Sequence, residues 1–589
     1  MRIRLDFPRN GTPYVFTDPI KVLTVRDYHQ VTLALKELQD WTNRGYWVAG
    51  FLSYEAAYGL EEAGKYASYF VSHAPETTFP LLGFGVFKEP VAMWEVENEA
   101  SYTIDEWGFD PPVTQEEYER KITAIRQYIS QGLSYQINFT LRMSSHFQGD
   151  PWPFYRMLRE AQKASYTAYL QWDDYAILSM SPELLFSQNG HFVLTRPMKG
   201  TARRGRFYAE DMNYKEELKK SEKNRAENIM IADLFRNDLG RIAQKGSVRV
   251  YALCQAEAYP TVWQLTTEIR AKTSEAVPWS EVLQVLFPSG SITGAPKLSS
   301  MKIINELESS PREIYCGTIG YASPYGQADF NVAIRTVWID QARHKAFFGT
   351  GGGITWDSRS QDEYDELLTK SRFLTLSQPT WSLLETMKLD TGKIWLKSYH
   401  LLRIEQAAAY YRIPLDSHSL HAYLLNLEEQ HQSGLWRIRV SVNGSGQISG
   451  ETLPWNVISP GIQEVSWAKE PSNSADPLFF HKTTQRDFYN RIHPKDSQSF
   501  DHLLWNEKEE VTEFTRGNLV ILYRGELLTP LQECGLLAGT FRTLLLERQI
   551  IREARIQPKT LANCQKMWFI NSLYGWVPVA LNASEDFPS

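Results

Sequence analysis

The sequence predicts a protein of the mixed α+β or α/β class that consists of two modules. Hydrophobic residues make up 43% and charged residues 22% of the 589 positions, as in ordinary globular proteins. A clear helical pattern at residues 114–131 is followed directly by an alternating, strand-like pattern. At residues 374–382, LTLSQPTWS, a helix-like segment ends before a fresh strand-like run begins. We therefore expect one module at residues 1–375 and a second at residues 376–589.

Composition excludes several classes of protein. Lysine and arginine total 62 against 69 acidic residues, giving a formal net charge of −7, and no dense basic run with interleaved aromatics appears. Nucleic acid is therefore not an expected partner. The first residues, MRIRLDFPRNGTPYVF, hold no apolar stretch of signal-peptide length, and charges interrupt the later apolar runs. The four cysteines lie far apart without a CxxC pair. We expect a cytoplasmic protein with no membrane association, disulfide framework or zinc site.

The first module opens with segments of different character. Residues 90–113 are acidic and contain prolines, which favours a long connection. Residues 114–131 are predicted to form a helix, because Thr114 and Glu117 have the spacing of a capping box and an apolar stripe follows.

The next segment, SYQINFTLRM, alternates between apolar and polar residues. Tyr135, Ile137, Phe139 and Leu141 share one face, and the opposite face is polar. The polar face carries Gln136, Asn138, Thr140 and Arg142. Such a face meets solvent or lines a polar cavity, and the pattern alone favours solvent.

The segment RPMKGTARRG surrounds one lysine with other cations. A lysine in that setting loses proton affinity, which is one route to an amine nucleophile near neutral pH. Lys199 is that lysine, with Arg196, Arg203 and Arg204 nearby. In isolation a solvated basic loop is the more common interpretation.

Two further segments carry candidate polar groups. The segment KNRAENIMIADLFRNDLGR is predicted to be helical, and in isolation Glu227 and Asp233 are typical of surface carboxylates. The segment FPSGSITGAPK lacks the GxxxxGK[ST] pattern, which excludes a nucleotide phosphate loop. Its small residues still leave backbone N–H groups able to approach an anion.

The segment FGTGGGITWDSRSQDEYDELLTK leads from a glycine-rich strand end into a helix. Glu363, Glu366 and Lys370 have i, i+3, i+7 spacing and therefore share one helix face. They form either an exposed charge ladder or a site for a hard cation and a substrate carboxylate, because Mg²⁺ takes few carboxylates together with substrate oxygens.

Seven motifs in order make residues 110–372 similar to the chorismate-utilising enzymes. The motifs are SPELLF, RPMKGT, AENIMIADLFRNDLGR, FPSGSITGAPK, the CGTIGY run, NVAIRT, and GGGITWDS with DEYDELLTK. The resemblance implies a chorismate-binding β-sandwich with helices, as in anthranilate synthase. It also implies Mg²⁺ held by Glu227 and Glu366 with Glu363 nearby. Chorismate contacts would come from Arg335, Lys370, Gln136, Thr201 and Gly352.

Within that family the segment PMKGT resembles the aminodeoxychorismate synthases, whereas anthranilate synthases carry alanine at the lysine position. The resemblance makes Lys199 the nucleophile at C2 of chorismate and Glu183 the general acid for the departing C4 hydroxyl. Isochorismate and salicylate synthases have a lysine where this sequence has Gln136. One departure is Gln264, where many relatives carry a histidine linked to pyruvate elimination.

The second module begins LLETMKLDTGKIWLKSYHLLRIEQAAAYY, which predicts two strands around an Asp-Thr-Gly turn and then a helix with Arg403 near its start. Residues 503–530 are predicted to form consecutive hairpins, with turns at residues 506–508 and 524–526. The segment GLLAGTFRTLLLE predicts a glycine-bounded loop that opens a helix.

The motifs HxxR, HKTTxR, VTExxxxN and GxxxGTxR make this module similar to the fold-type IV pyridoxal-phosphate enzymes, a branched-chain-aminotransferase-like fold, and among them to aminodeoxychorismate lyase. The resemblance implies that Lys482 binds the cofactor covalently and that Glu513 pairs with its ring nitrogen. Arg403 and the Thr540 loop would hold the phosphate. Amino-acid transaminases share these residues. In isolation Lys482 and Glu513 are typical of surface positions.

Together the resemblances imply amination of chorismate and then pyruvate elimination to 4-aminobenzoate, with Mg²⁺ and pyridoxal phosphate as cofactors. No cysteine lies in a GxCxG-type elbow, so ammonia is expected from a separate glutamine amidotransferase subunit. A homodimer through the second module is a further expectation. The alternatives are an anthranilate- or isochorismate-type synthase fused to a class IV amino-acid transaminase, and a catalytically inactive metabolite sensor. Residues 1–90 resemble the part that binds tryptophan in some relatives.

Overall fold

The computed structural model describes residues 1–7, 11–60, 64, 69–70, 79–92, 101–109, 112–274, 277–375, 381–456, 461–494, 497–582 and 587–588. The chain divides into two compact units, one of residues 1–203 and 215–378 and one of residues 204–214 and 379–589. The sequence placed a single change of module at residues 375 and 376 and did not separate residues 204–214. Over the described residues, we find no helix with the length and apolar character needed to cross a membrane.

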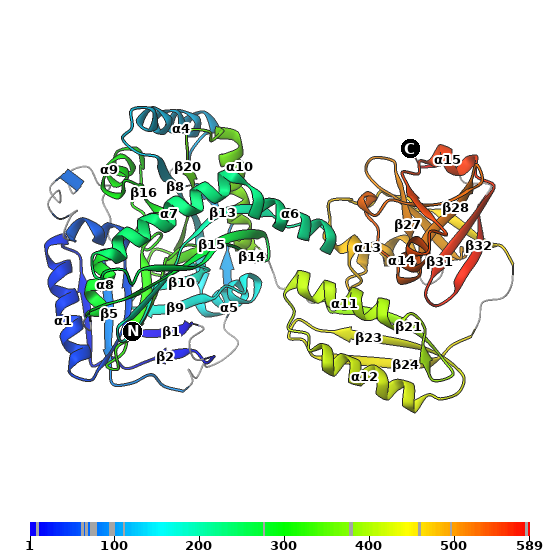
Figure 1. Cartoon of the computed structure of the whole chain (residues 1–589), viewed down its shortest axis with the longest axis horizontal. Coiled ribbons are helices and arrows are strands. Elements are labelled where there is room, and N and C mark those ends of the chain that lie inside the picture. The colour runs from blue at the N-terminus through cyan, green and yellow to red at the C-terminus, as the bar shows by residue number, and fades with distance from the viewer. Residues whose placement is uncertain are drawn as a thin grey trace. The chain divides into compact units, whose positions relative to one another are not determined.

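The first unit contains two large, mainly antiparallel sheets (Figure 1). In its described residues, the first sheet comprises β1 (Arg2–Asp6), β2 (Tyr14–Phe16), β6 (Tyr102–Ile104), β7 (Gly108–Phe109), β8 (Gln136–Gly149), β9 (Tyr166–Trp172), β10 (Tyr175–Ser181), β16 (Gly294–Ala295), β19 (Thr336–Asp340) and β20 (Lys345–Ile354). Its order is β16-β8-β20-β19-β10-β9-β1-β2, and β6 and β7 pair with β8.

The second sheet of this unit carries the RPMKGT segment. It comprises β3 (Lys21–Val25), β4 (Trp47–Leu52), β5 (Leu82–Phe87), β11 (Leu184–Asn189), β12 (Phe192–Arg196), β13 (Met198–Arg203), β14 (Arg249–Ala258), β15 (Val262–Lys272), β17 (Thr318–Ala322) and β18 (Gln327–Asn331). Its order is β13-β15-β12-β11-β18-β17-β4-β5-β3, and β14 also pairs with β15.

Apolar side chains from both sheets share one core, so the sheets form a sandwich. Leu5 of β1 and Trp338 of β19 belong to the same buried cluster as Phe51 of β4 and Tyr321 of β17. Alternate residues of each strand point to one face, which is why one set fills this core while the other set meets helices. The predicted β-sandwich is confirmed.

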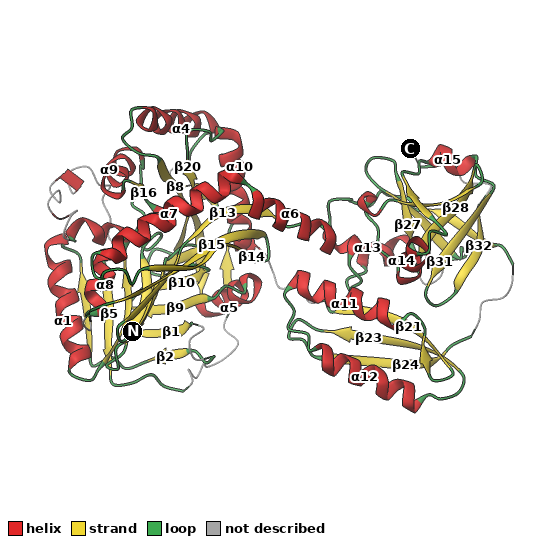
Figure 2. Cartoon of the chain, viewed as in Figure 1, coloured by secondary structure: helices red, strands yellow, loops and turns green. Residues whose placement is uncertain are grey.

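Helices cover the outer faces of the sandwich (Figure 2). They are α1 (Val31–Asn43), α4 (Gln115–Ser130), α5 (Pro151–Gln162), α7 (Glu222–Gly240), α8 (Trp279–Leu286), α9 (Lys297–Leu307) and α10 (Ser360–Ser371), with short 3-10 turns at Tyr28–Gln30, Tyr54–Gly59, Gly290–Ile292 and Arg372–Thr375. Helices α1, α7 and α8 bury side chains against the second sheet. Helices α4, α9 and α10 pack together on β8 and β20. Helix α6 (Tyr208–Lys220) begins in the segment assigned to the second unit.

Two expectations for this unit have different outcomes. The helix predicted at residues 114–131 is confirmed as α4, where Thr114 accepts a hydrogen bond from the backbone N–H of Glu117 at 3.2 Å. The expectation that residues 90–113 only connect other elements is wrong, because β6 and β7 lie within that range. These short strands were missed because two or three residues give no readable alternation.

The second unit opens with a four-stranded sheet in the order β22-β21-β23-β24. The described strands and helices are β21 (Leu383–Asp390), β22 (Lys393–Ile394), β23 (Leu435–Val442) and β24 (Ile448–Pro454), with α11 (Lys397–Tyr411) and α12 (Ser417–Gln430). Both helices share a core with alternate residues of β21 and β23, such as Met387 and Ile438. The predicted strand–turn–strand–helix is therefore confirmed, although Arg403 lies in the middle of α11.

An eight-stranded sheet follows in the order β27-β26-β25-β32-β31-β28-β29-β30, with an additional β27–β28 pairing that closes part of it into a barrel. The described elements are β25 (Gln463–Trp467), β26 (Asp501–Trp505), β27 (Val511–Phe514), β28 (Asn518–Tyr523), β29 (Glu526–Pro530), β30 (Arg552–Ala554), β31 (Lys566–Asn571), β32 (Gly575–Leu581), α13 (Asp487–Ile492), α14 (Thr540–Glu547), α15 (Pro558–Ala562), and 3-10 turns at Pro477–Phe480 and Gln532–Cys534. The predicted hairpins and the helix after GLLAG are confirmed.

Two candidate active sites

The first unit contains a cavity of about 360 Å³, formed where β8, β13, β20, α7 and α10 meet. Nine side chains or glycines predicted from the sequence line it, although they come from segments more than 180 positions apart. They are Glu183, Lys199, Thr201, Glu227, Arg335, Gly352, Glu363, Glu366 and Lys370. The cavity therefore gathers the acids, the amines and the guanidinium that the sequence singled out.

Lys199 projects from β13 into this cavity. Burial lowers the pKa of its amine from the usual lysine value, and the nearby Lys370 lowers it further, while Glu227 opposes the shift. A lowered pKa increases the fraction of neutral amine, which is the nucleophilic form.

The reason expected from the sequence is wrong, even though the direction of the shift is right. We expected the neighbouring arginines to depress the pKa of Lys199. Arg196 instead pairs with Glu257, and Arg204 pairs with Asp211 at 2.7 Å. Removal of the amine from water is the main cause. Burial of this kind cannot be read from a loop-like run of basic residues.

Glu183 lies immediately before β11 with only 2% of its surface exposed. Its Oε1 accepts a hydrogen bond from the Ser291 hydroxyl at 2.6 Å. Burial raises the pKa of Glu183 to about 7, although the Ser291 hydrogen bond and the charge of Lys199 both act to lower it. A carboxyl group with this pKa can donate a proton near neutral pH.

The remaining carboxylates approach the cavity from two helices. Glu227 comes from α7, and Glu363 and Glu366 come from α10. Glu366 pairs with Lys370 at 2.9 Å. Among the described residues no three acidic, histidine or cysteine side chains are close enough to form a metal cluster. Burial raises the pKa of Glu227, and the charge of Glu366 adds to this shift. A pair of neighbouring carboxylates suits Mg²⁺, which keeps waters and substrate oxygens as its other ligands.

Gln136 lies on β8 beside Lys199, although it is not among the residues that line the cavity. It is 1% exposed, and neither polar atom of its side-chain amide has a hydrogen-bond partner among the described residues. A Cβ atom added at Gly353 would collide with both the Gln136 amide nitrogen and the Lys199 Nζ. The absence of a side chain at Gly353 therefore leaves the space that both groups occupy. An unsatisfied buried amide is costly and is typical of a ligand contact.

The solvent interpretation of this strand's polar face is wrong. Gln136, Asn138 and Thr140 are 1%, 8% and 6% exposed. Asn138 lines the cavity. Alternation identified the polar face correctly, but a period of two does not tell which partner covers that face.

Asn228 is a functional neighbour that sequence reasoning missed. Its side-chain amide donates to the backbone carbonyls of Lys199 at 2.9 Å and Leu265 at 3.2 Å, and its oxygen accepts from the Thr267 hydroxyl. The residue follows Glu227 on α7 and thus fixes the backbone of Lys199 relative to that helix. Its place inside the AENIM motif was the available signal.

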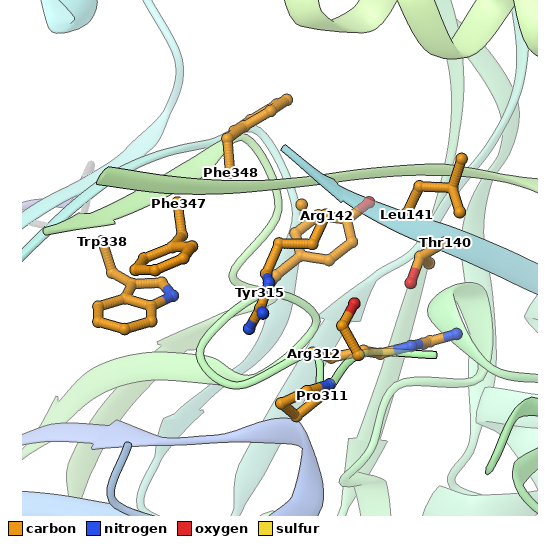
Figure 3. A pocket seen from close by; sticks show the side chains of 11 residues that line it. Thr140, Leu141, Arg142, Pro311, Arg312, Tyr315, Trp338, Phe347 and Phe348 are labelled. Atoms are coloured by element: carbon orange, nitrogen blue, oxygen red, sulfur yellow. The ribbon is translucent and has the colours of Figure 1, made fainter. Parts of the chain in front are cut away.

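A buried ion pair bonds to the backbone of two cavity-lining residues, Asn138 and Ile292. Arg312 and Glu308 are 2.7 Å apart, and Arg312 also donates to the carbonyls of Asn138 at 2.6 Å and Ile292 at 2.7 Å. Glu308 accepts from the backbone N–H of Thr140 at 2.8 Å. Figure 3 shows Arg312 and Thr140 at an adjoining small cavity of about 10 Å³. The pair joins β8 to the turn that carries Ser291. Nothing in the LESSPRE segment indicated this role.

The second unit contains a cavity of about 520 Å³ between its two sheets. Its walls include four residues that the sequence assigned to a cofactor: Arg403, Lys482, Glu513 and Thr540. Burial lowers the pKa of Lys482 to about 7, and the charges of Arg486 and Arg403 lower it as well. A neutral amine is the form that condenses with an aldehyde.

The other three residues fit pyridoxal phosphate. Burial raises the pKa of Glu513 to about 8, so this carboxyl group can share a proton with a pyridine nitrogen. Glu385 holds Arg403 through two hydrogen bonds of 2.6 and 2.8 Å. A third bond joins Arg403 to the carbonyl of Ala538, two residues before Thr540 at the start of α14. A guanidinium group beside a helix N-terminus is a suitable phosphate site.

Comparisons with known proteins identify both units. Residues 95–376 match the family model of chorismate binding enzymes, and residues 382–581 match that of class IV amino-transferases. The chain is 40% identical over 258 residues to aminodeoxychorismate synthase component 1 of Escherichia coli, which covers 44% of this chain and 56% of that protein. It is 38% identical over 262 residues to anthranilate synthase component 1 of Aquifex aeolicus, covering 44% of this chain and 52% of that protein. The chain thus spans little more than half the length of these curated relatives.

A solved structure agrees with the fold of the first unit. The menaquinone-specific isochorismate synthase of Escherichia coli superimposes with a TM-score of 0.51 at 17% identity, covering 64% of this chain and 87% of that chain. This likeness agrees with the predicted fold of the first unit. The two family matches confirm the predicted fold class and both family resemblances.

Proposed function

Because the chain joins a chorismate-binding-enzyme domain to a class IV amino-transferase domain, we propose that it is a bifunctional enzyme that makes 4-aminobenzoate. The first unit would aminate chorismate to 4-amino-4-deoxychorismate. The second would eliminate pyruvate from that compound. The observation that carries the proposal is the half-buried Lys199, whose amine has a lowered pKa and shares one cavity with Glu183.

In the first step Lys199 attacks C2 of the chorismate ring. Both double bonds of the conjugated ring diene shift, the C4–O bond breaks, and the departing hydroxyl leaves as water with a proton from Glu183. Ammonia then bonds to C4, both double bonds shift back, and the bond from Lys199 to C2 breaks. The neutral amine and the protonated carboxyl group that this sequence needs are the forms favoured by burial.

Glu227 and Glu366 are the residues that would hold Mg²⁺, with Glu363 beside them. When bound, the ion would supply positive charge for a substrate carboxylate. Arg335 is suited to a second carboxylate contact, because its guanidinium lines the cavity. Thr201, Gly352 and Lys370 complete the proposed chorismate contacts.

Two glutamines favour amination over the alternative reactions. Gln136 has no basic nitrogen that could activate water for an isochorismate-type reaction. Gln264 lines the cavity where a histidine linked to pyruvate elimination is found in many relatives. Both substitutions suit a product that keeps its enolpyruvyl group.

A class IV amino-transferase domain implies pyridoxal phosphate, which supplies an electron sink when it is bound. Lys482 would attach to the cofactor until the substrate amine replaces it. Its freed amine would then take the proton from C4 of the substrate ring and deliver one to the enolpyruvyl group as pyruvate leaves. Glu513 would hold a proton at the ring nitrogen, and Arg403 and Thr540 would bind the phosphate. The pKa of Lys482, about 7, suits both proton transfers.

Ammonia is proposed to come from a separate glutamine amidotransferase, since relatives of the first unit are named component 1. A cytoplasmic location and a homodimer through the second unit complete the proposal. Fractionation of cells and light scattering of the purified protein test these two points.

Identification of the aromatic product is the decisive test. The purified chain is incubated with chorismate, Mg²⁺, ammonium and pyridoxal phosphate, and the product is separated and identified by mass and retention. We expect 4-aminobenzoate and pyruvate. Anthranilate as the product would assign the first unit to the alternative reaction. Accumulation of aminodeoxychorismate, with transamination of amino acids, would make the second unit a transaminase.

A further inference from the structure

The cavity of the second unit carries far more positive charge than the cofactor requires. In the part of the chain that the structure describes, five arginines and one lysine line it, against the single carboxyl group of Glu513. The basic residues are Arg403, Arg437, Arg439, Lys482, Arg486 and Arg516. A cofactor phosphate adjacent to Arg403 accounts for only part of this charge.

Most of these cations already have partners. Arg403 is bonded to Glu385, and Arg516 to Asp501 at 3.0 Å. Arg439 lies 3.8 Å from Glu451 at the exposed edge of the sheet. Arg486 donates to the carbonyl of Thr515 at 2.6 Å.

Arg437 differs, because neither an acidic side chain nor a carbonyl oxygen pairs with it among the described residues. It contacts an aromatic ring instead, because its guanidinium carbon lies 5.4 Å from the centroid of the Trp455 ring. A half-buried guanidinium without an acid is a ready site for an anion.

The period of β23 explains why Arg437 faces the cavity. Ile438, Val440 and Val442 alternate into the core beneath α11 and α12. The intervening residues must point to the opposite face of the sheet. Thr386, which pairs with Arg439 across β21, lines the same cavity.

Two aromatic rings complete this wall. Trp455 follows β24, and Tyr574 lies in the turn between β31 and β32. Their ring centroids are 5.3 Å apart. The turn is held by Asn571, whose oxygen accepts the backbone N–H groups of Leu573 and Tyr574 at 3.0 and 2.8 Å. The wall thus offers flat apolar surface beside an unpaired cation.

We propose that Arg437, Trp455 and Tyr574 form a subsite for a carboxylate attached to a six-membered ring. This inference rests on the proposed elimination reaction and specifies its substrate class. In 4-amino-4-deoxychorismate the ring carboxylate lies across the ring from the reacting amine. With the amine at Lys482 and the ring against the aromatic side chains, the carboxylate would pair with Arg437.

The subsite would separate this reaction from transamination of simple amino acids. A substrate with one carboxylate next to its amine leaves Arg437 unpaired and the aromatic wall uncovered. A ring substrate with a remote carboxylate satisfies both. Selection would thus come from a half-buried charged group that only the correct substrate pairs.

The test uses the full-length chain with Lys199→Ala, so that the first reaction cannot supply or consume material. Aminodeoxychorismate is added, and 4-aminobenzoate formation is measured. Arg437→Met should raise KM at least about tenfold with a smaller change in kcat, and Arg437→Lys should recover part of the loss. Arg552→Met is the matched control, since Arg552 is an exposed arginine paired with Glu526 at 3.3 Å. An unchanged KM in Arg437→Met would overturn the proposal.

A second measurement separates the substrate carboxylate from the cofactor phosphate as the anion bound by Arg437. The affinity for pyridoxal phosphate, obtained by titrating the apoenzyme, should be the same in Arg437→Met and Arg552→Met. A parallel loss of cofactor affinity would assign Arg437 to the phosphate and contradict the subsite.

Binding of 4-aminobenzoate keeps the inference testable without turnover. This compound carries the ring and the carboxylate, and its binding is followed by calorimetry. Weakening by Arg437→Met and not by Arg552→Met supports the subsite even if the second unit proves not to be a lyase. Absence of 4-aminobenzoate formation by the parent chain would count against the proposed function alone. Equal affinity in the two variants would count against the subsite alone.

Discussion

The cavities of the two units each contain a half-buried lysine but differ in the charges around it. Among the described residues, four carboxyl groups and four basic side chains line the first cavity. One carboxyl group and six lysine or arginine side chains line the second cavity. Burial is the first cause of the lowered lysine pKa in both. The surrounding charge then decides the partner, because paired carboxylates suit a hard cation whereas excess positive charge suits an anionic cofactor and an acidic substrate.

Exchange of the two lysines for alanine should have the largest effect. Lys199→Ala should lower amination of chorismate on the order of 10³-fold or more, because a group that bonds to the ring is lost. Elimination from added aminodeoxychorismate should be unchanged. Lys482→Ala should show the reverse pattern and accumulate aminodeoxychorismate. Product analysis by chromatography measures both.

A non-kinetic readout supports the second assignment. Borohydride reduction of the cofactor-loaded chain, followed by peptide mass spectrometry, should place the cofactor on Lys482 and leave none attached in Lys482→Ala. Loss of both activities in either folded variant would contradict two independent sites.

Metal dependence should distinguish the cavities next. Glu227→Gln and Glu366→Gln each remove an anionic oxygen, so the Mg²⁺ concentration for half-maximal amination should rise at least roughly tenfold. Asp233→Asn is the matched control, because Asp233 lies on the same helix but pairs with Arg236 at 2.6 Å at the surface. The elimination step should show no Mg²⁺ response. If a variant has an unchanged Mg²⁺ titration, the residue that it replaces is not a Mg²⁺ ligand.

The space beside Lys199 provides a smaller test of the first cavity. Gly353→Ala adds a Cβ where the Lys199 amine and the Gln136 amide lie. Displacement of a reacting group by about 1 Å can cost roughly 10²-fold in rate, so amination should fall by that order while the elimination step is retained. Gly240→Ala, at a helix end with no atom within 4 Å of the added Cβ, should leave both rates unchanged. Equal rates in the two variants would show that the neighbours adapt.

The sequence predicted residue identities better than it predicted their surroundings. Motif order identified Lys199 and Glu227, and helix spacing put Glu363, Glu366 and Lys370 on one face, as observed in α10. Burial could not be predicted, since it depends on pairings between distant strands. The polar face of β8 was therefore assigned to solvent, and the pKa shift of Lys199 was attributed to arginines that turn out to have acidic partners.

Residues that position other residues could not be predicted from the sequence either. Ser291 bonds to Glu183, Asn228 to the backbone of Lys199, and Arg312 to the backbone of the cavity-lining Asn138. These hydrogen bonds join segments 29 to 174 positions apart. Short-range patterns carry no information on such contacts. Ser291 and Asn228 lie in motifs shared with a known family. A motif does not, however, indicate which groups these side chains bind.

Removal of the hydrogen bond from Ser291 to Glu183 should have the smallest of the predicted effects. It should shift the pH optimum of amination in a defined direction. This bond lowers the pKa of Glu183 against the effect of burial, so Ser291→Ala should raise that pKa above its value of about 7. The proposed amination needs a neutral Lys199 and a protonated Glu183, and the optimum of a two-group profile lies midway between the two pKa values. The optimum should therefore move to higher pH by a few tenths of a unit, whichever group titrates first, because a hydrogen bond contributes roughly 1 kcal/mol. Profiles of kcat/KM against pH for the wild-type and variant chains measure the shift, and Ser299→Ala, which alters a surface hydroxyl bonded to the Leu133 carbonyl, serves as the control. A shift to lower pH would show that Ser291 does not stabilise the ionised form of Glu183.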